Sequence, residues 1–303
     1  MATTANAPTK SEADHRARVA VVGVDSSLGA RLALEHAGQR VGPEGRLVVV
    51  HAINPPTNEP FSEPLVDLAP DRRTIAQQLV DRMRRDAGTH ATTEIAEGSP
   101  AELLAGIARR EQADEIVVGS RGLGRFTAAL GSVSHALLHE ADRPVVVVPR
   151  AASDRPRTMR EHGRCTVVVG YDGSPSAQAA LRYAGARAGA DGRVVAVHGY
   201  EPAPDWLGSP DWQRVLEAHQ ARGRELLAAL EREPPIDASL ETSLLEGAPA
   251  RAIVAAAEAR DADEIAIGTR GFGPVRGALG SVSHAVLHEA TRPVVVFPGR
   301  AVA

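Results

Sequence analysis

The sequence predicts an α/β protein in which one domain occurs twice along the chain. The segments GSRGLGRFTAALGSVSHALLHEADRPVVVVP (119–149) and GTRGFGPVRGALGSVSHAVLHEATRPVVVFP (268–298) are identical at 22 of 31 positions without a gap. Such internal similarity indicates a duplication. Each copy also alternates short apolar runs with helical patterns, which is typical of an open parallel sheet covered by helices on both faces.

The sequence of the first copy predicts nine secondary-structure elements, and the second copy repeats their order. The expected strands are 17–25, 46–53, 92–98, 114–120 and 143–149. The expected helices are 26–41, 70–88, 100–113 and 131–141. The helix at 26–41 carries serine at its cap, and the helix at 100–113 starts at proline, as first turns prefer. Along 70–88, Ile75, Leu79 and Met83 are spaced to form one apolar face.

Domain boundaries follow from the repeat and from polar, unpatterned stretches. We expect a disordered tail over 1–16, which lacks the apolar run of a signal peptide. Two domains follow over 17–150 and 164–300, joined by a linker over 151–163. The fifth strand of each copy is apolar throughout (VVVV and VVVF). A bare apolar edge invites pairing with another strand, so the two domains are predicted to dock through these strands as a pseudo-dimer.

Composition excludes several classes of protein. The formal net charge is -4, with no basic surplus to suggest nucleic acid, and no run of 18 apolar residues suggests a membrane span. These features favour a cytoplasmic protein. Lys10, in the tail, is the only lysine. A P-loop, a protein kinase or a pyridoxal enzyme each needs a lysine in its folded core. The single cysteine, Cys165, excludes an intrachain disulfide and is expected to be a packed strand residue.

The chemistry of the chain is concentrated in a glycine-rich loop after the fourth strand of each copy. In the first copy, Gly119, Gly122 and Gly124 follow the strand, and Gly131 and Ser132 open a helix. First-turn N–H groups and the helix dipole suit phosphate oxygens, and glycines let a phosphate approach closely. Ser132 and Ser134 would add hydroxyl donors. Arg121 and Arg125 would add positive charge unless they face solvent. The matching residues of the second copy are Gly268, Arg270, Gly271, Gly273, Arg276, Gly280, Ser281 and Ser283.

Some of these residues also have purely structural explanations. The glycines would then only turn the chain, although their recurrence at one spacing in both copies favours phosphate binding. Asp25 and Asp172 end the first strand of each copy. They would either help Ser27 and Ser174 cap the next helix or contact a ribose or base, and both roles are compatible.

Histidines four residues apart occur on a helix of each copy. They are His135 and His139 in the first copy and His284 and His288 in the second. This spacing can hold zinc, but no third ligand is apparent in the sequence, so we expect no metal site.

The combination of motifs resembles the universal stress protein family. GSRGLG…LGSVSHALLHEADRPVVVVP and its second copy resemble the C-terminal signature of that family, and VGVDSS and VGYDGS resemble its start. The resemblance covers nearly the whole chain, twice, as in tandem members. It implies a Rossmann-like fold with five-stranded sheets of order 3-2-1-4-5 and pairing through strand five.

Members of the family with a Gly-x2-Gly-x9-Gly-Ser/Thr motif bind ATP, and others do not. Carried over, the motif falls on Gly119, Gly122, Gly131 and Ser132, and on Gly268, Gly271, Gly280 and Ser281. Here eight residues rather than nine separate the second and third glycines in both copies. The resemblance also places Asp25 and Asp172 near adenosine, and the backbone of 51–52 and 198–199 near adenine.

These observations together give two candidate ATP sites, with ATP, with or without magnesium, as the expected ligand. The first comprises Gly23, Asp25, Ser27, Ala52, Gly119, Arg121, Gly122, Gly124, Gly131, Ser132, Val133 and Ser134. The second comprises Gly170, Asp172, Ser174, Gly199, Gly268, Arg270, Gly271, Gly273, Gly280, Ser281, Val282 and Ser283.

Three functions remain open from the sequence. The first, which the glycine loops favour, is a cytoplasmic ATP-binding regulatory protein of stress responses, without enzymatic turnover. Its protein partners are unknown, and a homodimer of the chain is one candidate assembly. The second is a weak ATP-hydrolysing enzyme of the same fold. The third is a nucleotide-free interaction scaffold, which the shortened glycine spacing keeps open.

Overall fold

The computed structural model describes residues 17–53, 71–86, 91–120, 130–154, 164–201, 211–269 and 279–299. The tail 1–16 and most of the expected linker lie outside this range. A short 3-10 helix, η2 (Arg150–Asp154), covers the last residue of the first domain and the first four residues of the expected linker, and its Ala152 packs against the core. The beginning of the predicted linker is therefore ordered against the domain that precedes it.

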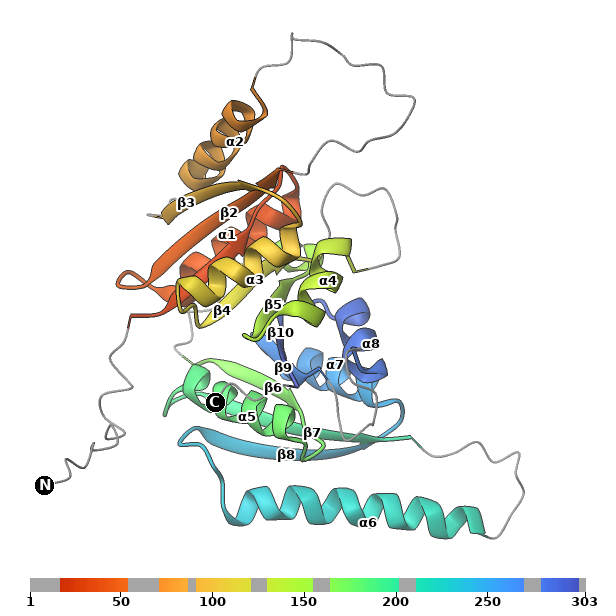
Figure 1. The fold of residues 1–303 in the computed structure, drawn as a ribbon. Coiled ribbons are helices and arrows are strands. Elements are labelled where there is room, and N and C mark those ends of the chain that lie inside the picture. Colours follow the sequence, from red (N-terminus) through yellow and green to blue (C-terminus); the bar gives the residue numbers. More distant parts are fainter. Residues whose placement is uncertain are drawn as a thin grey trace, which may run out of the picture.

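Each half of the chain alternates strands and helices, as the sequence predicts (Figure 1). The elements of the first half are β1 (Val19–Gly23), α1 (Leu28–Val41), β2 (Arg46–Ile53), α2 (Arg72–Asp86), β3 (Ala91–Glu97), α3 (Pro100–Arg110), β4 (Glu115–Gly119), α4 (Ser132–Glu140) and β5 (Val145–Val148). The elements of the second half are β6 (Thr166–Gly170), α5 (Pro175–Ala188), β7 (Arg193–Tyr200), α6 (Asp211–Arg232), β8 (Ser239–Glu246), α7 (Pro249–Ala259), β9 (Glu264–Gly268), α8 (Ser281–Glu289) and β10 (Val294–Phe297).

The strands form one ten-stranded sheet of order β3-β2-β1-β4-β5-β10-β9-β6-β7-β8. Within each half the strands are parallel and follow the order 3-2-1-4-5. The halves meet where β5 and β10 pair antiparallel, with Val146 opposite Val295. The predicted docking through the fifth strands is confirmed, because this pairing satisfies the backbone groups of two apolar edges at once.

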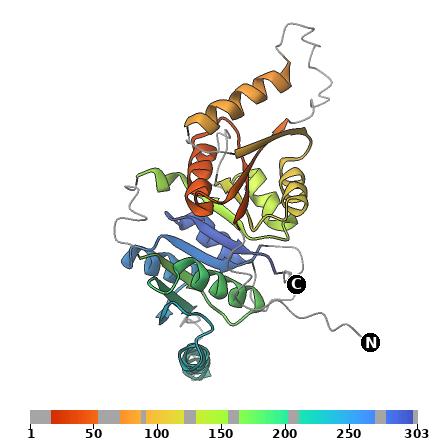
Figure 2. The same ribbon diagram turned by 90° about the vertical axis from the view of Figure 1, so that its left-hand side faces the viewer.

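Helices cover both faces of the sheet, and Figure 2 shows α1 and α3 on opposite sides of the first half's strands. Alternate strand residues point to opposite faces, so the core has two layers. One layer is formed with α3, α4, α7 and α8, and the other with α1, α2, α5 and α6. The sheet interior therefore consists mostly of valine, isoleucine and alanine, as strands buried on both faces require.

The buried face of α2 differs from the face expected for 70–88. Ala76, Val80 and Met83 are buried, whereas Ile75 is 48% exposed and Leu79 lies at the margin. Ile75 precedes Ala76 by one position, which rotates it by about 100° around the helix and away from the sheet. The prediction was correct for Met83 and wrong for Ile75.

Candidate functional site

The glycine that precedes α4 or α8 fixes the helix start beside the end of a central strand. Gly131 is the N-cap of α4, and its N–H donates to the carbonyl of Ser120, just after β4, at 2.7 Å. Gly280 caps α8 in the same way, with its N–H 2.8 Å from the carbonyl oxygen of Thr269. Both glycines have φ near -60°, which any residue can adopt. The backbone conformation therefore does not require glycine at either position.

The first turns of α4 and α8 present amides toward the carboxyl ends of the strands. Within the described residues, no side chain caps either helix. The amides of Ser132, Val133 and Ser134, and of Ser281, Val282 and Ser283, occupy the first three helical positions, which have no intrahelical partner. Ser132 and Ser281, the first residues of the two helices, are exposed. Three consecutive amides at a helix start are able to bind an anion.

Ser134 and Ser283 have a role that the sequence did not indicate. Both are buried, and their hydroxyls donate to the carbonyls of Gly119 and Gly268 at 2.8 and 2.7 Å. A serine hydroxyl has a single proton, and here the protein itself accepts it. In this structure these hydroxyls bond to backbone carbonyls, and the bonds hold each helix start against its strand, whereas donation to a phosphate stays a prediction.

Gly119 and Gly268 are required by packing. A Cβ on Gly119 would lie 2.6 Å from the backbone carbon of Gly29 in α1, and a Cβ on Gly268 would lie 2.2 Å from the Ser176 hydroxyl oxygen. Both distances are far below van der Waals contact. These glycines thus bring the strand end close to the first turn of α1 or α5.

Gly23, Gly170 and Gly199 are packed in a similar way. A Cβ on Gly23 would meet the Leu104 side chain at 2.8 Å, one on Gly170 would meet Ile253 at 2.6 Å, and one on Gly199 would meet the backbone of Pro249 at 2.6 Å. Glycine at these positions lets α3 or α7, the helix that follows the third strand of each half, pack closely on the sheet.

Asp25 and Asp172 support the next helix start in both halves. The Asp25 carboxylate accepts the Ser27 N–H at 2.9 Å, and Ser27 Oγ accepts the Ala30 N–H at 3.1 Å. Asp172 bonds to the Ser174 N–H at 2.9 Å, and Ser174 Oγ accepts from Ala177. The capping alternative is therefore present in the structure. Both aspartates remain half-buried at the strand ends where the resemblance places the adenosine.

Two histidine side chains join the first and second strand ends, and the sequence reasoning considered only their backbone. His51 Nδ1 lies 2.9 Å from the carbonyl oxygen of Val24, and His198 Nδ1 lies 2.8 Å from that of Tyr171. A carbonyl only accepts, so Nδ1 carries the proton in each ring. The signal was available, because both histidines occupy the same position of the repeat. Ala52 follows His51 on β2 and is half-buried.

Thr269 contributes a buried polar group at the second site. Its hydroxyl oxygen has no hydrogen-bond partner within the part of the chain that the structure describes, although the residue is only 5% exposed. Thr269 follows Gly268, and its carbonyl accepts from the cap of α8. A buried hydroxyl without a partner is rare in proteins and often marks a ligand or ordered water.

The remaining loop residues of the prediction lie outside the described residues. They are Arg121, Gly122, Gly124, Arg125, Arg270, Gly271, Gly273 and Arg276. The eight-residue glycine spacing falls in the same segments.

The first histidine of each pair donates its backbone N–H to the cap residue of α4 or α8, and the second histidine lies in the last turn of the helix. His135 and His139 are exposed, with their Nε2 atoms 3.4 Å apart, and the rings of His284 and His288 are 4.4 Å apart. Among the described residues, no group of three or more histidine, cysteine, aspartate or glutamate side chains is placed to share a metal ion.

Comparison with known proteins decides the family. The model of the universal stress protein family matches residues 17–149 and 164–298, one match for each half. The chain belongs to the universal stress protein family. The two matches make it a tandem member.

Some relatives match one half of the chain, and others match both halves. A universal stress protein of Thermus aquaticus is 43% identical over 136 residues, which cover 43% of this chain and 96% of the relative. A universal stress protein of Mycolicibacterium smegmatis is 32% identical over 300 residues, covering 92% of this chain and 97% of the relative. The duplication is thus shared with a full-length universal stress protein.

The fold is also found among solved structures. The crystal structure of a universal stress protein from Archaeoglobus fulgidus superimposes with a TM-score of 0.60 at 24% identity and covers 93% of this chain and 97% of that one. This similarity supports the tandem fold. Among the described residues, no helix is both long and apolar enough to cross a membrane.

Proposed function

We propose that each half of this universal stress protein binds one adenine nucleotide, ATP with or without magnesium, and that the chain is a regulatory protein of the cytoplasm that acts in stress responses. The observation that carries the proposal is that, among the described residues, no side chain caps the first turn of α4 or α8, which lies at the carboxyl ends of parallel strands. Open α/β sheets bind their ligands at this edge. Asp25 and Asp172, with the ends of β2 and β7, would then face the nucleoside.

The chemistry of the chain favours binding over turnover. Phosphoryl transfer needs positioned cations and a group that orients the nucleophile. The single lysine lies in the tail, and the sequence shows no paired carboxylates beside the glycine loops. We therefore expect ATP hydrolysis well below about 1 per second, the lower end of the common enzyme range. A faster rate would favour the enzyme alternative.

The test is calorimetry with ATP on the wild-type chain and on Gly131→Val and Gly280→Val. Valine fits the extended backbone at these caps, and no side-chain cap is lost, but its methyl groups would stand before the first-turn amides. We expect two nucleotides per wild-type chain, one for each single variant and none for the double variant. Gly106→Ala in α3, where a Cβ would meet nothing within 4 Å, is the control.

The scaffold alternative retains one supporting observation. The hydroxyls of Ser134 and Ser283, together with Gly119 and Gly268, serve the packing of the protein itself. A chain that binds no ATP in calorimetry, and carries no nucleotide when purified, would favour the scaffold.

A further inference from the structure

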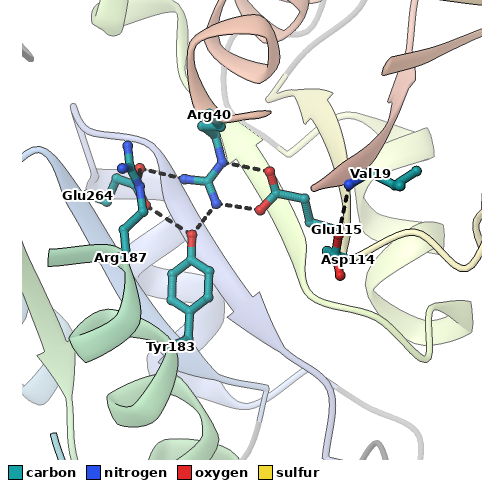
Figure 3. Close-up of polar contacts among 7 residues, drawn as sticks. All are labelled: Val19, Arg40, Asp114, Glu115, Tyr183, Arg187 and Glu264. Carbon is teal, nitrogen blue, oxygen red and sulfur yellow. Dashed lines mark hydrogen bonds and ion pairs between the residues drawn. The ribbon is translucent and has the colours of Figure 1, made fainter. Parts of the chain in front are cut away.

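A buried ionic cluster joins the two halves beneath the β5–β10 seam (Figure 3). Its centre is Arg40, in the last turn of α1, whose side chain has no solvent exposure. Arg40 donates to Glu115 at the start of β4 and to Glu264 at the start of β9. Glu264 belongs to the other half and is also fully buried. One guanidinium therefore bridges the two domains.

Two residues of α5 complete the cluster from the second half. The Arg187 guanidinium donates to Glu264 at 3.0 Å, and the Tyr183 hydroxyl donates to Glu264 at 3.2 Å. The Arg40 guanidinium also bonds to the Tyr183 hydroxyl. The two arginines balance the two glutamates, so the buried assembly is neutral as a whole. Such a cluster tolerates no missing partner, because each charge would lose its compensation out of water.

The charges of the cluster interact strongly. Burial alone would raise the pKa of Glu264, but the charges of Arg40 and Arg187 outweigh it and hold that pKa far below its usual value. For Glu115, Arg40 likewise overcomes the effect of burial and lowers the pKa. Both carboxylates therefore stay ionised at neutral pH.

The cluster is asymmetric although the halves supply matching residues. Arg187 occupies in α5 the position that Arg40 occupies in α1, and Tyr183 matches His36 in the same way. Arg40 holds both glutamates, whereas the described bonds of Arg187 to the cluster reach only Glu264, and its side chain is 18% exposed. The arginine of the first half therefore occupies the centre of the cluster, and the arginine of the second half lies at its margin.

Each element that carries the cluster also carries a candidate site at its other end. Helix α1 begins at the Ser27 cap beside Asp25 and ends at Arg40, and β4 runs from Glu115 to Gly119. In the second half, α5 begins at Ser174 and β9 ends at Gly268. A helix of 14 residues spans roughly 20 Å as a rigid rod.

The strand and the helix also touch within the site. The close approach of Gly119 to Gly29, and of Gly268 to Ser176, fixes each strand end against the first helical turn. A shift of the helix relative to the strand at the site would therefore move Arg40 relative to Glu115 in the cluster, where Arg40 also holds Glu264.

We propose that the Arg40–Glu264 bridge couples the two sites, so that a nucleotide in one half changes the affinity of the other half. This inference rests on the proposed function and assigns its regulation. The two sites share the bridge through α1 and β4 on one side and α5 and β9 on the other. Coupling between sites can be carried by rigid elements that share a salt-bridge network, and the Arg40 guanidinium links the halves in such a network by pairing with Glu115 and with Glu264.

The test uses a variant that removes the bridge without leaving an unbalanced charge. Arg40→Met with Glu115→Gln removes one positive and one negative group of the first half and leaves the Arg187–Glu264 pair intact. The matched control is Arg46→Met with Glu111→Gln. It makes the same chemical changes at a surface pair of the same half, with side chains 43% and 24% exposed.

The first measurement needs no nucleotide. Both substitutions of the bridge variant lie in the first half, yet amide hydrogen exchange should become at least about fivefold faster in α5 and β9 of the second half. The control variant should leave these segments unchanged. Wild-type protection of α5 and β9 in the bridge variant would overturn the proposal.

The second measurement is ATP calorimetry. Gly131→Val and Gly280→Val each leave one site, so the two variants together give the affinity of each site alone. If the sites are independent, the wild-type isotherm should equal the one calculated from these two affinities. We expect the wild-type isotherm to differ from the calculated one by the equivalent of a change of about fivefold or more in the ATP affinity of one site when the other is occupied. The difference should vanish in the bridge variant and persist in the control. An additive wild-type isotherm would overturn the coupling and leave the proposed function standing, whereas the absence of ATP binding would overturn both.

Discussion

Arg40 of the first half donates a hydrogen bond to Glu264 of the second half, 224 residues further along the chain. The pair lies beneath the seam where β5 and β10 join the two five-stranded halves. It closes the interface by a polar contact at a depth where valine and isoleucine otherwise predominate.

Removal of the Arg40 charge alone should destabilise the chain strongly. In Arg40→Met, Glu115 loses its ion-pair partner among the described residues, and Glu264 loses one of its two. We expect the free energy of unfolding in urea to fall by about 3–5 kcal/mol, as for other broken buried pairs. The charge-balanced Arg40→Met/Glu115→Gln should lose less, and Arg46→Met at the surface at most about 1 kcal/mol. Equal losses in Arg40→Met and Arg46→Met would contradict the role given to the cluster.

Stability should depend on pH through His36, which packs beside Arg40 on α1. Burial, reinforced by the Arg40 charge, lowers the pKa of His36 from 6.5 to about 4. Between these values the unfolded chain binds a proton that the folded chain does not, so stability falls as pH falls. From pH 7 to pH 5 we expect a loss of about 2 kcal/mol from this residue.

The comparison for this prediction is His36→Met, which keeps the volume and removes the titrating ring. Between pH 7 and pH 5, the free energy of unfolding of His36→Met in urea should fall by about 2 kcal/mol less than that of the wild type. Glu115 and Glu264, whose pKa values are lowered, affect stability only at more acidic pH. A variant as sensitive to pH as the wild type would show that His36 is not the cause.

Much of the fold could be predicted from the sequence. Strand and helix order, the serine caps at Ser27 and Ser174 and the pairing of the fifth strands follow from local patterns and from the repeat. The Arg40–Glu264 bridge could not be predicted, because an arginine in the last turn of a helix is ordinary and its partner lies far along the chain. A signal existed, since the arginine and the glutamate recur at matching positions of both copies.

The site was predicted less completely than the fold. The sequence located the helix starts at Gly131 and Gly280. It could not show that Gly119 and Gly268 leave room for the neighbouring helix, because this close packing depends on the tertiary structure. It also could not show that Ser134 points inward, because burial depends on how α4 is rotated on the sheet.

Gly119 should therefore be sensitive to substitution even without nucleotide. In Gly119→Ala the new Cβ would lie 2.6 Å from the backbone of α1, and we expect a loss of about 1–3 kcal/mol in urea unfolding. Gly106→Ala, in the interior of α3 with open space around it, should instead stabilise by about 1 kcal/mol. An unchanged free energy of unfolding in Gly119→Ala would contradict the close packing of β4 on α1.

The Cys165 thiol should react slowly in the folded chain. Burial raises the pKa of this thiol to about 11. The reactive thiolate is therefore scarce at pH 8, and iodoacetamide should modify the folded chain roughly a hundredfold more slowly than the chain unfolded in urea. Intact mass measures the rate directly because the chain has one cysteine. Similar rates in both states would show that the thiol is accessible and unperturbed.

The claim on which the functional account depends is that the first-turn amides of α4 and α8 hold the phosphates of ATP. Amide NMR of the 15N-labelled chain during an ATP titration tests it most directly. If these amides bind the phosphates, the largest shifts should fall on the amides of 132–134 and 281–283. Large shifts elsewhere, with these six amides unchanged at saturation, would contradict it.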